Sequence, residues 1–106
     1  GFDWDNIDDA WKKVTEEAGE LREAYMSGDR AKSEEEIGDL LFAVVNVARF
    51  LKIEPELALT GTIGKFIKRF EYIEKNADRS LDKMTLDEMD LLWNKAKTVF
   101  SEQKDV

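Results

Sequence analysis

Two pairs of acidic residues are spaced so that each pair shares one face of a helix. Glu17 and Glu20 are three positions apart, and Glu36 and Asp39 repeat that spacing further along the chain. Residues three apart are neighbours on a helix surface, so each pair presents two carboxylates together. If the two helices are antiparallel neighbours, the four carboxylates converge on one point. Oxygen ligands of this kind suit Mg²⁺ or Mn²⁺.

A magnesium ion held by carboxylates would favour chemistry on phosphates. Mg²⁺ keeps several of its waters and bridges to phosphate oxygens, which suits phosphoryl or nucleotidyl transfer to water. A second set of residues fits the same substrate class, because Lys65 and Arg69 lie four apart on one helix face with Lys68 beside them. These cations would neutralise phosphate charge that the metal does not reach.

The same residues also have an ordinary structural interpretation. Acid runs at helical spacing usually form a solvated face or meet a lysine, and surface cations commonly pair with acids such as Glu71 or Glu74. Spacing alone leaves the site and the solvated face as open alternatives.

Composition excludes several functional classes. The chain has 106 residues, a formal net charge of -8 and a sequence pI near 4.6. This balance argues against a nucleic-acid partner, which would need a basic face. The absence of histidine and cysteine excludes imidazole bases, thiolate metal sites and disulfides. No run is apolar enough for a membrane span or a signal peptide, so we expect a cytoplasmic protein without a membrane partner.

Apolar periodicity predicts an all-α fold with four helices in a single domain over residues 1–106. Residues 1–6 are interpreted as a lead-in, and residues 101–106 as a frayed tail. The first helix is expected from Ile7 to near Gly28, with Asp5 or Asn6 as its cap. Its core stripe is expected at alternating four- and three-residue steps: Ile7, Trp11, Val14, Ala18, Leu21 and Tyr25.

The later helix starts carry capping signals. Asp29 would begin the second helix early, whereas Ser33 with Glu36 would form a capping box later; we favour Asp29, which leaves the Glu36 side chain inside the helix. Pro55 suits the first position of the third helix. A Thr85–Glu88 capping box opens the fourth, after a loop from Asn76 to Met84.

The second helix is apolar around most of its circumference from Ile37 to Leu51. This pattern predicts a helix buried on several sides. A single polar stripe remains, at Glu36, Asp39, Ala43 and Asn46. The apolar surface exceeds what one small bundle covers, which fits a homodimer.

In combination, these motifs resemble one family. Glu16-Glu17-x-x-Glu20 followed by Glu36-x-x-Asp39 resembles the E-E-x-x-E…E-x-x-D signature of the MazG family of all-α nucleoside triphosphate pyrophosphohydrolases. Further segments also resemble that family, and they are residues 1–4, 36–43 with 45–49, 65–70 and 92–93. The resemblance covers nearly the whole chain, and is greatest to the carboxy-terminal catalytic domain of a longer MazG protein.

The resemblance implies a four-helix bundle that forms a homodimer and cleaves nucleoside triphosphates to the monophosphate and pyrophosphate. It implies Mg²⁺, or Mn²⁺ in its place, as cofactor, and our leading hypothesis for the mechanism is that metal-activated water attacks the α-phosphate. Carried over by position, the metal ligands would be Glu17, Glu20, Glu36 and Asp39. Lys65 and Arg69, with Lys68 beside them, would contact the phosphates. Glu16 would be an outer helper or base, and Asn46 would bond the base or sugar.

The chain departs from the family pattern before Lys65. Ile63, followed by Gly64, stands where the family has a polar asparagine. This departure bears on affinity and substrate preference, and it favours an alternative in which the site binds nucleotide with little turnover. A helical dimerisation module whose acids are solvated is a third alternative.

Overall fold

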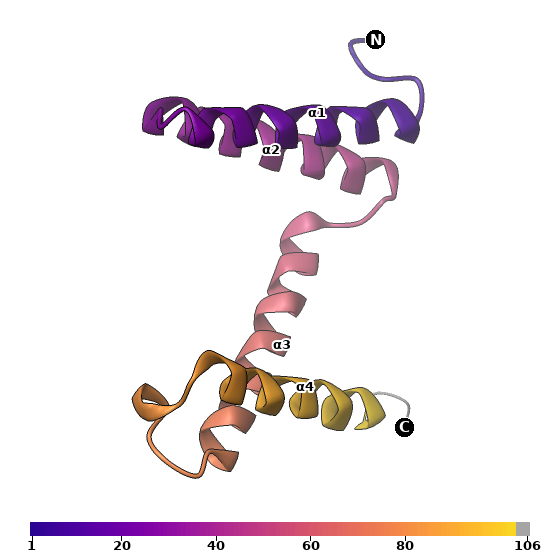
Figure 1. Ribbon diagram of the computed structural model, residues 1–106. Helices are drawn as coiled ribbons and strands as arrows, with labels where there is room; N and C mark the ends of the chain where they lie inside the picture. The colour runs from indigo at the N-terminus through magenta and orange to yellow at the C-terminus, as the bar shows by residue number, and fades with distance from the viewer. Residues whose placement is uncertain (104–106) are drawn as a thin grey trace. The chain divides into compact units, whose positions relative to one another are not determined.

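The computed structural model describes residues 1–103, with side chains through Ser101, and within these residues it holds helices and no strand. The described residues form four α-helices: α1 (Ile7–Met26), α2 (Arg30–Phe50), α3 (Pro55–Asn76) and α4 (Leu86–Gln103) (Figure 1). A short 3₁₀ helix, η1 (Leu81–Lys83), precedes α4. The expected all-α class is therefore confirmed. None of these helices is long and apolar enough to cross a membrane, as judged over the described residues.

Local capping sets the ends of α1 and α2. The Asn6 side chain accepts a hydrogen bond from the backbone N–H of Asp9 at 3.1 Å, which makes Asn6 the cap of α1. Asp29 caps α2 in the same way by accepting from Lys32 N–H at 2.9 Å. The Ser33 hydroxyl instead donates to the Asp29 carbonyl, so the early start of α2 is confirmed. Gly28 takes φ 78° in the turn, a value that glycine adopts without strain.

The starts of α3 and α4 also follow the sequence. Pro55 is the first residue of α3, where its missing N–H costs nothing. Thr85 and Glu88 form the expected capping box, with reciprocal backbone-to-side-chain bonds of 3.0 and 3.1 Å. Helix α4 continues through Gln103, so residues 101–103 of the expected tail are helical, while residues 104–106 lie outside the described residues.

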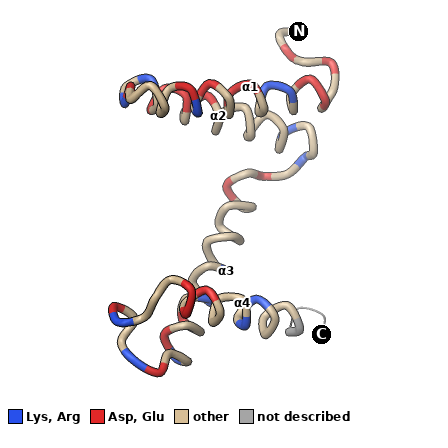
Figure 2. The backbone as a smooth tube through the Cα atoms, in the orientation of Figure 1, with Lys and Arg blue, Asp and Glu red and all other residues tan. Residues whose placement is uncertain are grey.

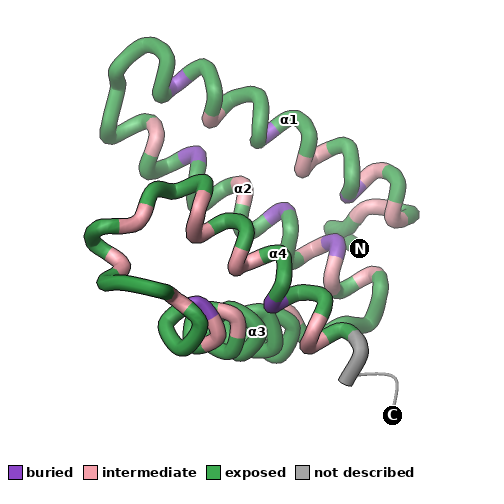
Figure 3. The backbone as a smooth tube through the Cα atoms, turned by 60° about the horizontal axis from the view of Figure 1, so that its bottom comes forward, coloured by how far each residue is buried: buried purple, intermediate pink, exposed green. Residues whose placement is uncertain are grey.

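The chain divides into two compact units, with the boundary after Ala58 near the start of α3. In the first unit, α1 and α2 lie side by side as an antiparallel hairpin (Figures 1 and 3). The buried residues of each helix are spaced to share one face, and they are Ala10, Glu17 and Ala24 on α1 and Glu36, Ala43 and Val47 on α2. We call these residues the contact line. Its alanines allow the two backbones to approach closely.

The contact line corrects the stripe expected for α1. Trp11, Ala18 and Tyr25 are exposed, and the flanking Ile7, Val14 and Leu21 are only half-buried. Periodicity locates an apolar face, but the small residues beside it determine which line two helices can bring closest. The centre of the face is therefore shifted by one position toward Ala10 and Ala24.

The prediction that α2 is buried on several sides is wrong for this chain by itself. Within the first unit α1 is the only helix that packs against α2, and a single neighbouring helix covers a single face. The uncovered apolar side chains of α2 are 45–69% exposed, and they are Ile37, Leu41, Phe42, Val44 and Val45.

In the second unit, aromatic contacts join α3 to α4. The rings of Phe66 and Trp93 have centroids 5.4 Å apart, and Tyr72 meets Phe100 edge-on at 6.3 Å. Ile73 of α3 and Ala96 of α4 are buried. The segment expected to be an irregular loop before α4 contains η1, and Arg79 pairs there with Glu88 of α4.

Candidate metal centre

Two carboxylates occupy the contact line of the first unit. Glu17 is 5% exposed and lies between Ala10 and Ala24 on α1, and Glu36 is 2% exposed and is followed by Ala43 and Val47 on α2. The polar stripe of α2 therefore faces α1 rather than solvent at Glu36. Burying a carboxylate is costly unless it is paired, so the acids require partners.

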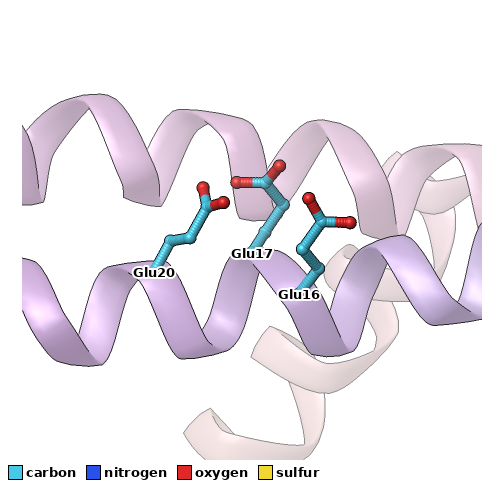
Figure 4. Close-up of side chains that lie close together, drawn as sticks. All are labelled: Glu16, Glu17 and Glu20. Atoms are coloured by element: carbon cyan, nitrogen blue, oxygen red, sulfur yellow. The ribbon is translucent and has the colours of Figure 1, made fainter.

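The structure gathers the four expected ligands around Glu17. Glu17, Glu36 and Asp39 each offer a carboxylate oxygen, and these oxygens lie within 4.8 Å of one another. Glu16, Glu17 and Glu20 form a second group by the same measure, and Figure 4 shows their carboxylates directed toward the neighbouring helix. Acidic positions recur along α1 in Figure 2. The convergence of both helical pairs is thus present in the first unit.

The neighbouring acids perturb the Glu20 carboxyl. The adjacent Glu36 carboxyl, and then the charge of Glu17, raise the pKa of the Glu20 carboxyl above its ordinary value. A raised pKa of this origin means that the cluster holds more negative charge than its surroundings compensate. A bound cation would relieve it.

Two lysines that the sequence analysis did not single out supply part of the compensation. Lys13 lies 3.1 Å from Glu17 and 3.2 Å from Glu16, and these acids raise the pKa of Lys13 in that order. Lys32 lies 3.2 Å from Glu36 and 3.6 Å from Glu35, and its pKa is raised likewise.

The signal for these lysines was present in the sequence. A Lys-x-x-Glu-Glu pattern occurs at residues 13–17 and again at residues 32–36. In both copies the lysine is four positions before the buried glutamate, a spacing that brings two helical side chains together.

One oxygen of each buried glutamate remains without a hydrogen-bond partner. The Oε1 atoms of Glu17 and Glu36 meet the two lysines, whereas both Oε2 atoms are buried and accept no hydrogen bond within the described part of the chain. Buried acceptors are rarely left in this state. An oxygen-only donor set with two buried, unpartnered carboxylate oxygens fits a hard divalent cation such as Mg²⁺.

Comparison with known proteins agrees with the geometry. The family model of the MazG nucleotide pyrophosphohydrolase domain matches residues 7–74, which include every residue of the acid cluster. The chain belongs to this family. The resemblance inferred from the signature residues is thereby confirmed.

Named relatives share this MazG domain. A *Thermotoga maritima* protein named nucleoside triphosphate pyrophosphohydrolase/pyrophosphatase MazG is 40% identical over 100 residues, covering 92% of this chain and 38% of that protein. An *Escherichia coli* K12 nucleoside triphosphate pyrophosphohydrolase is 41% identical over 104 residues, covering 92% and 39%. *Bacillus subtilis* YabN, described as uncharacterized, is 60% identical over 65 residues, covering 58% and 13%. The chain thus spans well under half of each of these relatives.

The expected phosphate-binding cations of the MazG domain belong to the second unit. Lys65 and Lys68 are exposed on α3, while the Arg69 guanidinium lies over the Trp93 ring of α4, 5.4 Å from its centroid. Trp93 thus holds Arg69 in place. The acids of the first unit are brought together, whereas the approach of these cations to them stays a prediction.

Asn46 lies beyond the acids on α2. It is half-buried, and its side-chain oxygen accepts a hydrogen bond of 3.5 Å from Arg49 Nε. Asp39, Phe42 and Asn46 follow one another at steps of three and four, which places them along one face of the helix.

Proposed function

We propose that this MazG domain hydrolyses nucleoside triphosphates to the nucleoside monophosphate and pyrophosphate, using a divalent cation. The observation that carries the proposal is the pair of buried glutamates, each with one unpartnered oxygen, at the centre of a four-carboxylate cluster. A solvated acidic face would not bury these oxygens. The names of the *T. maritima* and *E. coli* relatives support the choice of reaction.

The residues suited to hold Mg²⁺, or Mn²⁺ in its place, are Glu17, Glu20, Glu36 and Asp39. When bound, the cation would supply Lewis-acid stabilisation of phosphate charge and lower the pKa of a coordinated water. Lys13 and Lys32 hold the Oε1 atoms of Glu17 and Glu36 and so orient the unpartnered Oε2 atoms.

In the proposed reaction, water oxygen forms a bond to the α-phosphorus, and the bond from that phosphorus to the α,β-bridging oxygen breaks. Pyrophosphate leaves with the electron pair of the broken bond. Glu16, which is exposed beside Glu17, accepts the proton released by water. Lys65 and Arg69 stabilise the charge that develops on the pyrophosphate, with Lys68 as a further phosphate contact.

A homodimer forms part of the proposal, because the exposed apolar side chains of α2 need a cover that α1 does not give. We also propose that the domain functions within a longer protein, as its short share of the relatives suggests. We further propose that the protein is cytoplasmic.

A second candidate is a nucleotide-binding domain with little turnover. Ile63 favours it, because this side chain is 50% exposed on α3 and offers no hydrogen bond where the family pattern has an asparagine. The two candidates share the acid cluster and differ in catalytic rate.

A product assay distinguishes them. The chain is incubated with each of several nucleoside triphosphates and Mg²⁺ or EDTA, and pyrophosphate and orthophosphate are measured separately. We expect one pyrophosphate per monophosphate, with orthophosphate appearing only after inorganic pyrophosphatase is added. Metal-dependent binding without pyrophosphate release would favour the second candidate. If neither nucleotide binding nor pyrophosphate release is observed, both candidate functions are excluded, and the acids form a solvated face.

A further inference from the structure

Two ion pairs of the first unit join a partly exposed lysine to a buried carboxylate of the acid cluster. The Lys13 ammonium lies 3.1 Å from Glu17 Oε1, and the Lys32 ammonium lies 3.2 Å from Glu36 Oε1. The glutamate side chains are 7% and 3% exposed, whereas the lysine side chains are 39% and 51% exposed. Each lysine therefore reaches inward from solvent and brings its charge to an acid that the two helices bury.

Helix packing by itself holds the two glutamates in place. Glu17 and Glu36 lie on the contact line, where close packing between α1 and α2 restricts their side chains. Removing a lysine would thus remove charge compensation rather than orientation. A buried carboxylate that loses its cationic partner is strongly destabilising. The lysines are therefore needed most when no other cation is bound.

The two lysines and a bound metal ion would neutralise the same negative charge. The oxygens of Glu17, Glu36 and Asp39 lie within 4.8 Å of one another, and the lysines contact the two buried acids of this group. A divalent cation among these oxygens would lie close to both ammonium groups. Like charges repel, so lysine and metal oppose each other even where they meet different oxygens.

Open space beside Lys32 gives a cation access to this charge. Lys32 and Glu36 line one cavity of about 540 Å³ together with Glu20. Because Mg²⁺ keeps several of its waters, it needs such room beside its protein ligands. The half-exposed Lys32 side chain can turn toward solvent there without separating the helices.

We propose that Lys13 and Lys32 are internal counterions that stabilise the metal-free site and limit its affinity for the divalent cation, an inference that rests on the proposed function. In the metal-free chain, each lysine offsets the burial cost of one glutamate. When the cation binds, it compensates the same acids, and the lysines then oppose its binding. The same two side chains thus act in opposite directions on stability and on metal affinity.

Thermal melting tests the effect on stability. Lys13→Met and Lys32→Met keep an unbranched side chain that suits a helix but remove the charge. Circular dichroism follows the melting of each chain in EDTA and at rising Mg²⁺ concentration, without nucleotide. We expect both variants to melt several degrees below wild type in EDTA, and this difference to close as Mg²⁺ saturates the site.

Cation binding tests the effect on affinity. Titration with Mn²⁺, followed by electron paramagnetic resonance at a temperature where the chains are folded, gives the Kd. Each Met variant should bind Mn²⁺ about tenfold more tightly than wild type, a modest gain because solvent screens the partly exposed lysines. A role of the lysines in orienting the carboxylates alone predicts the opposite result, weaker binding.

Lys12→Met is the matched control, because it makes the same change in net charge one residue away. The Lys12 side chain is 80% exposed and pairs with Asp9 at 4.0 Å, outside the acid cluster. This variant should leave the Mn²⁺ affinity unchanged and should respond to Mg²⁺ as wild type does. Lys13→Arg, which keeps the charge, should behave as wild type in both measurements.

The outcomes separate this inference from the proposed function. A melting difference that persists at saturating Mg²⁺, or unchanged or weaker Mn²⁺ binding in both Met variants, would overturn the counterion role. If a Met variant is unfolded in EDTA, recovery of its helical signal with Mg²⁺ supports the role, and lack of recovery contradicts it. A wild-type chain that binds no Mn²⁺ would overturn the metal site and this inference together. Mn²⁺ binding without triphosphate hydrolysis would contradict the proposed reaction alone.

Discussion

Glu17 and Glu36 have the same local arrangement on two different helices. Each is buried on the contact line, pairs through Oε1 with a lysine four positions earlier, and leaves Oε2 without a partner. The lysines compensate the charge in part, and the raised pKa of Glu20 shows that repulsion remains. This excess of negative charge favours the binding of a cation and lowers the stability of the protein without one.

Replacing one acid should therefore separate activity from stability. Glu36→Gln or Asp39→Asn should reduce metal-dependent pyrophosphate release at least about a hundredfold, because a ligand to the charge-stabilising cation is lost. The melting temperature in EDTA should hold or rise slightly, since each change removes one of four repelling charges. Product release and thermal melting by circular dichroism measure the two effects. Wild-type activity in both variants would defeat the assignment of the metal ligands.

The cations of α3 are tested against a residue outside the proposed site. Lys65→Ala and Arg69→Ala should each lower kcat/KM about tenfold or more, because each removes charge that stabilises the leaving group. Lys97→Ala on α4 should have little effect. Arg69→Lys helps to separate charge from shape, since lysine keeps the charge but loses the planar group that lies over Trp93. If all the variants behave alike, Lys65 and Arg69 are ordinary surface charges.

At the scale of elements, helix ends depend on short-range bonds and helix pairing depends on side-chain size. The start of α4 shows the first effect, because Glu88 accepts from the Thr85 N–H and pairs with Arg79. These contacts, the Thr85 backbone first, lower the pKa of Glu88 from 4.5 to about 2. A lowered folded-state pKa adds stability above the unfolded pKa, and this stability is lost as pH falls through the folded value.

Glu88→Gln should reveal that pH window. Glutamine retains the capping geometry but not the charge, so the variant should melt below wild type at pH 7, by a small margin because solvent screens the exposed charge. The difference should shrink as pH falls from about 4.5 toward 2. Asp87→Asn, which removes a charge from the same helical turn, is the control and should show a smaller difference. A wild-type advantage that is constant from pH 7 to pH 2 would contradict the argument.

At the scale of the whole molecule, a net charge of -8 and the local acid cluster should couple stability to divalent cations. A cation that binds only the folded state at a hundredfold excess over its Kd adds about 2.7 kcal/mol. For a chain of this size that raises the melting temperature by several degrees. Mg²⁺ or Mn²⁺ should therefore stabilise more than sodium chloride at equal ionic strength.

A variant of the acid cluster and added nucleotide test the coupling between metal binding and stability. Asp39→Asn should blunt the rise caused by Mg²⁺, and nucleotide should add to stability only when the metal is present. Differential scanning calorimetry with matched salt concentrations measures both. Equal stabilisation by sodium and magnesium would indicate simple screening of a solvated acidic face.

The exposed apolar side chains of α2 predict association of two chains with or without metal. We expect a dimer by size-exclusion chromatography with light scattering. Leu41→Glu should shift it toward monomer, because Leu41 is an apolar side chain of α2 that is 61% exposed in the single chain. Ala31→Glu, at an exposed position near the start of the same helix, should leave the mass unchanged. A monomeric wild-type chain at micromolar concentration would exclude this interface.

The sequence by itself determined the helices and the spacing of the acids. Asn6, Asp29 and the Thr85–Glu88 box define helix starts through bonds spanning three residues, so the neighbouring sequence suffices to predict them. Glu36 and Asp39 likewise share one face of their helix because they are three residues apart, which the helical period alone predicts. The antiparallel convergence of two such pairs could be anticipated because a short turn joins the helices.

Only the tertiary structure decided which positions are buried. Ala10 and Ala24, rather than the larger Trp11 and Tyr25, lie on the contact line, because the closest line between two helices depends on both partners. The unpartnered oxygens of Glu17 and Glu36 depend on that same packing. The pairing of Asp3 with Arg49 joins residues that no local pattern relates. These features come from contacts between segments, which the period and capping of a single helix do not encode.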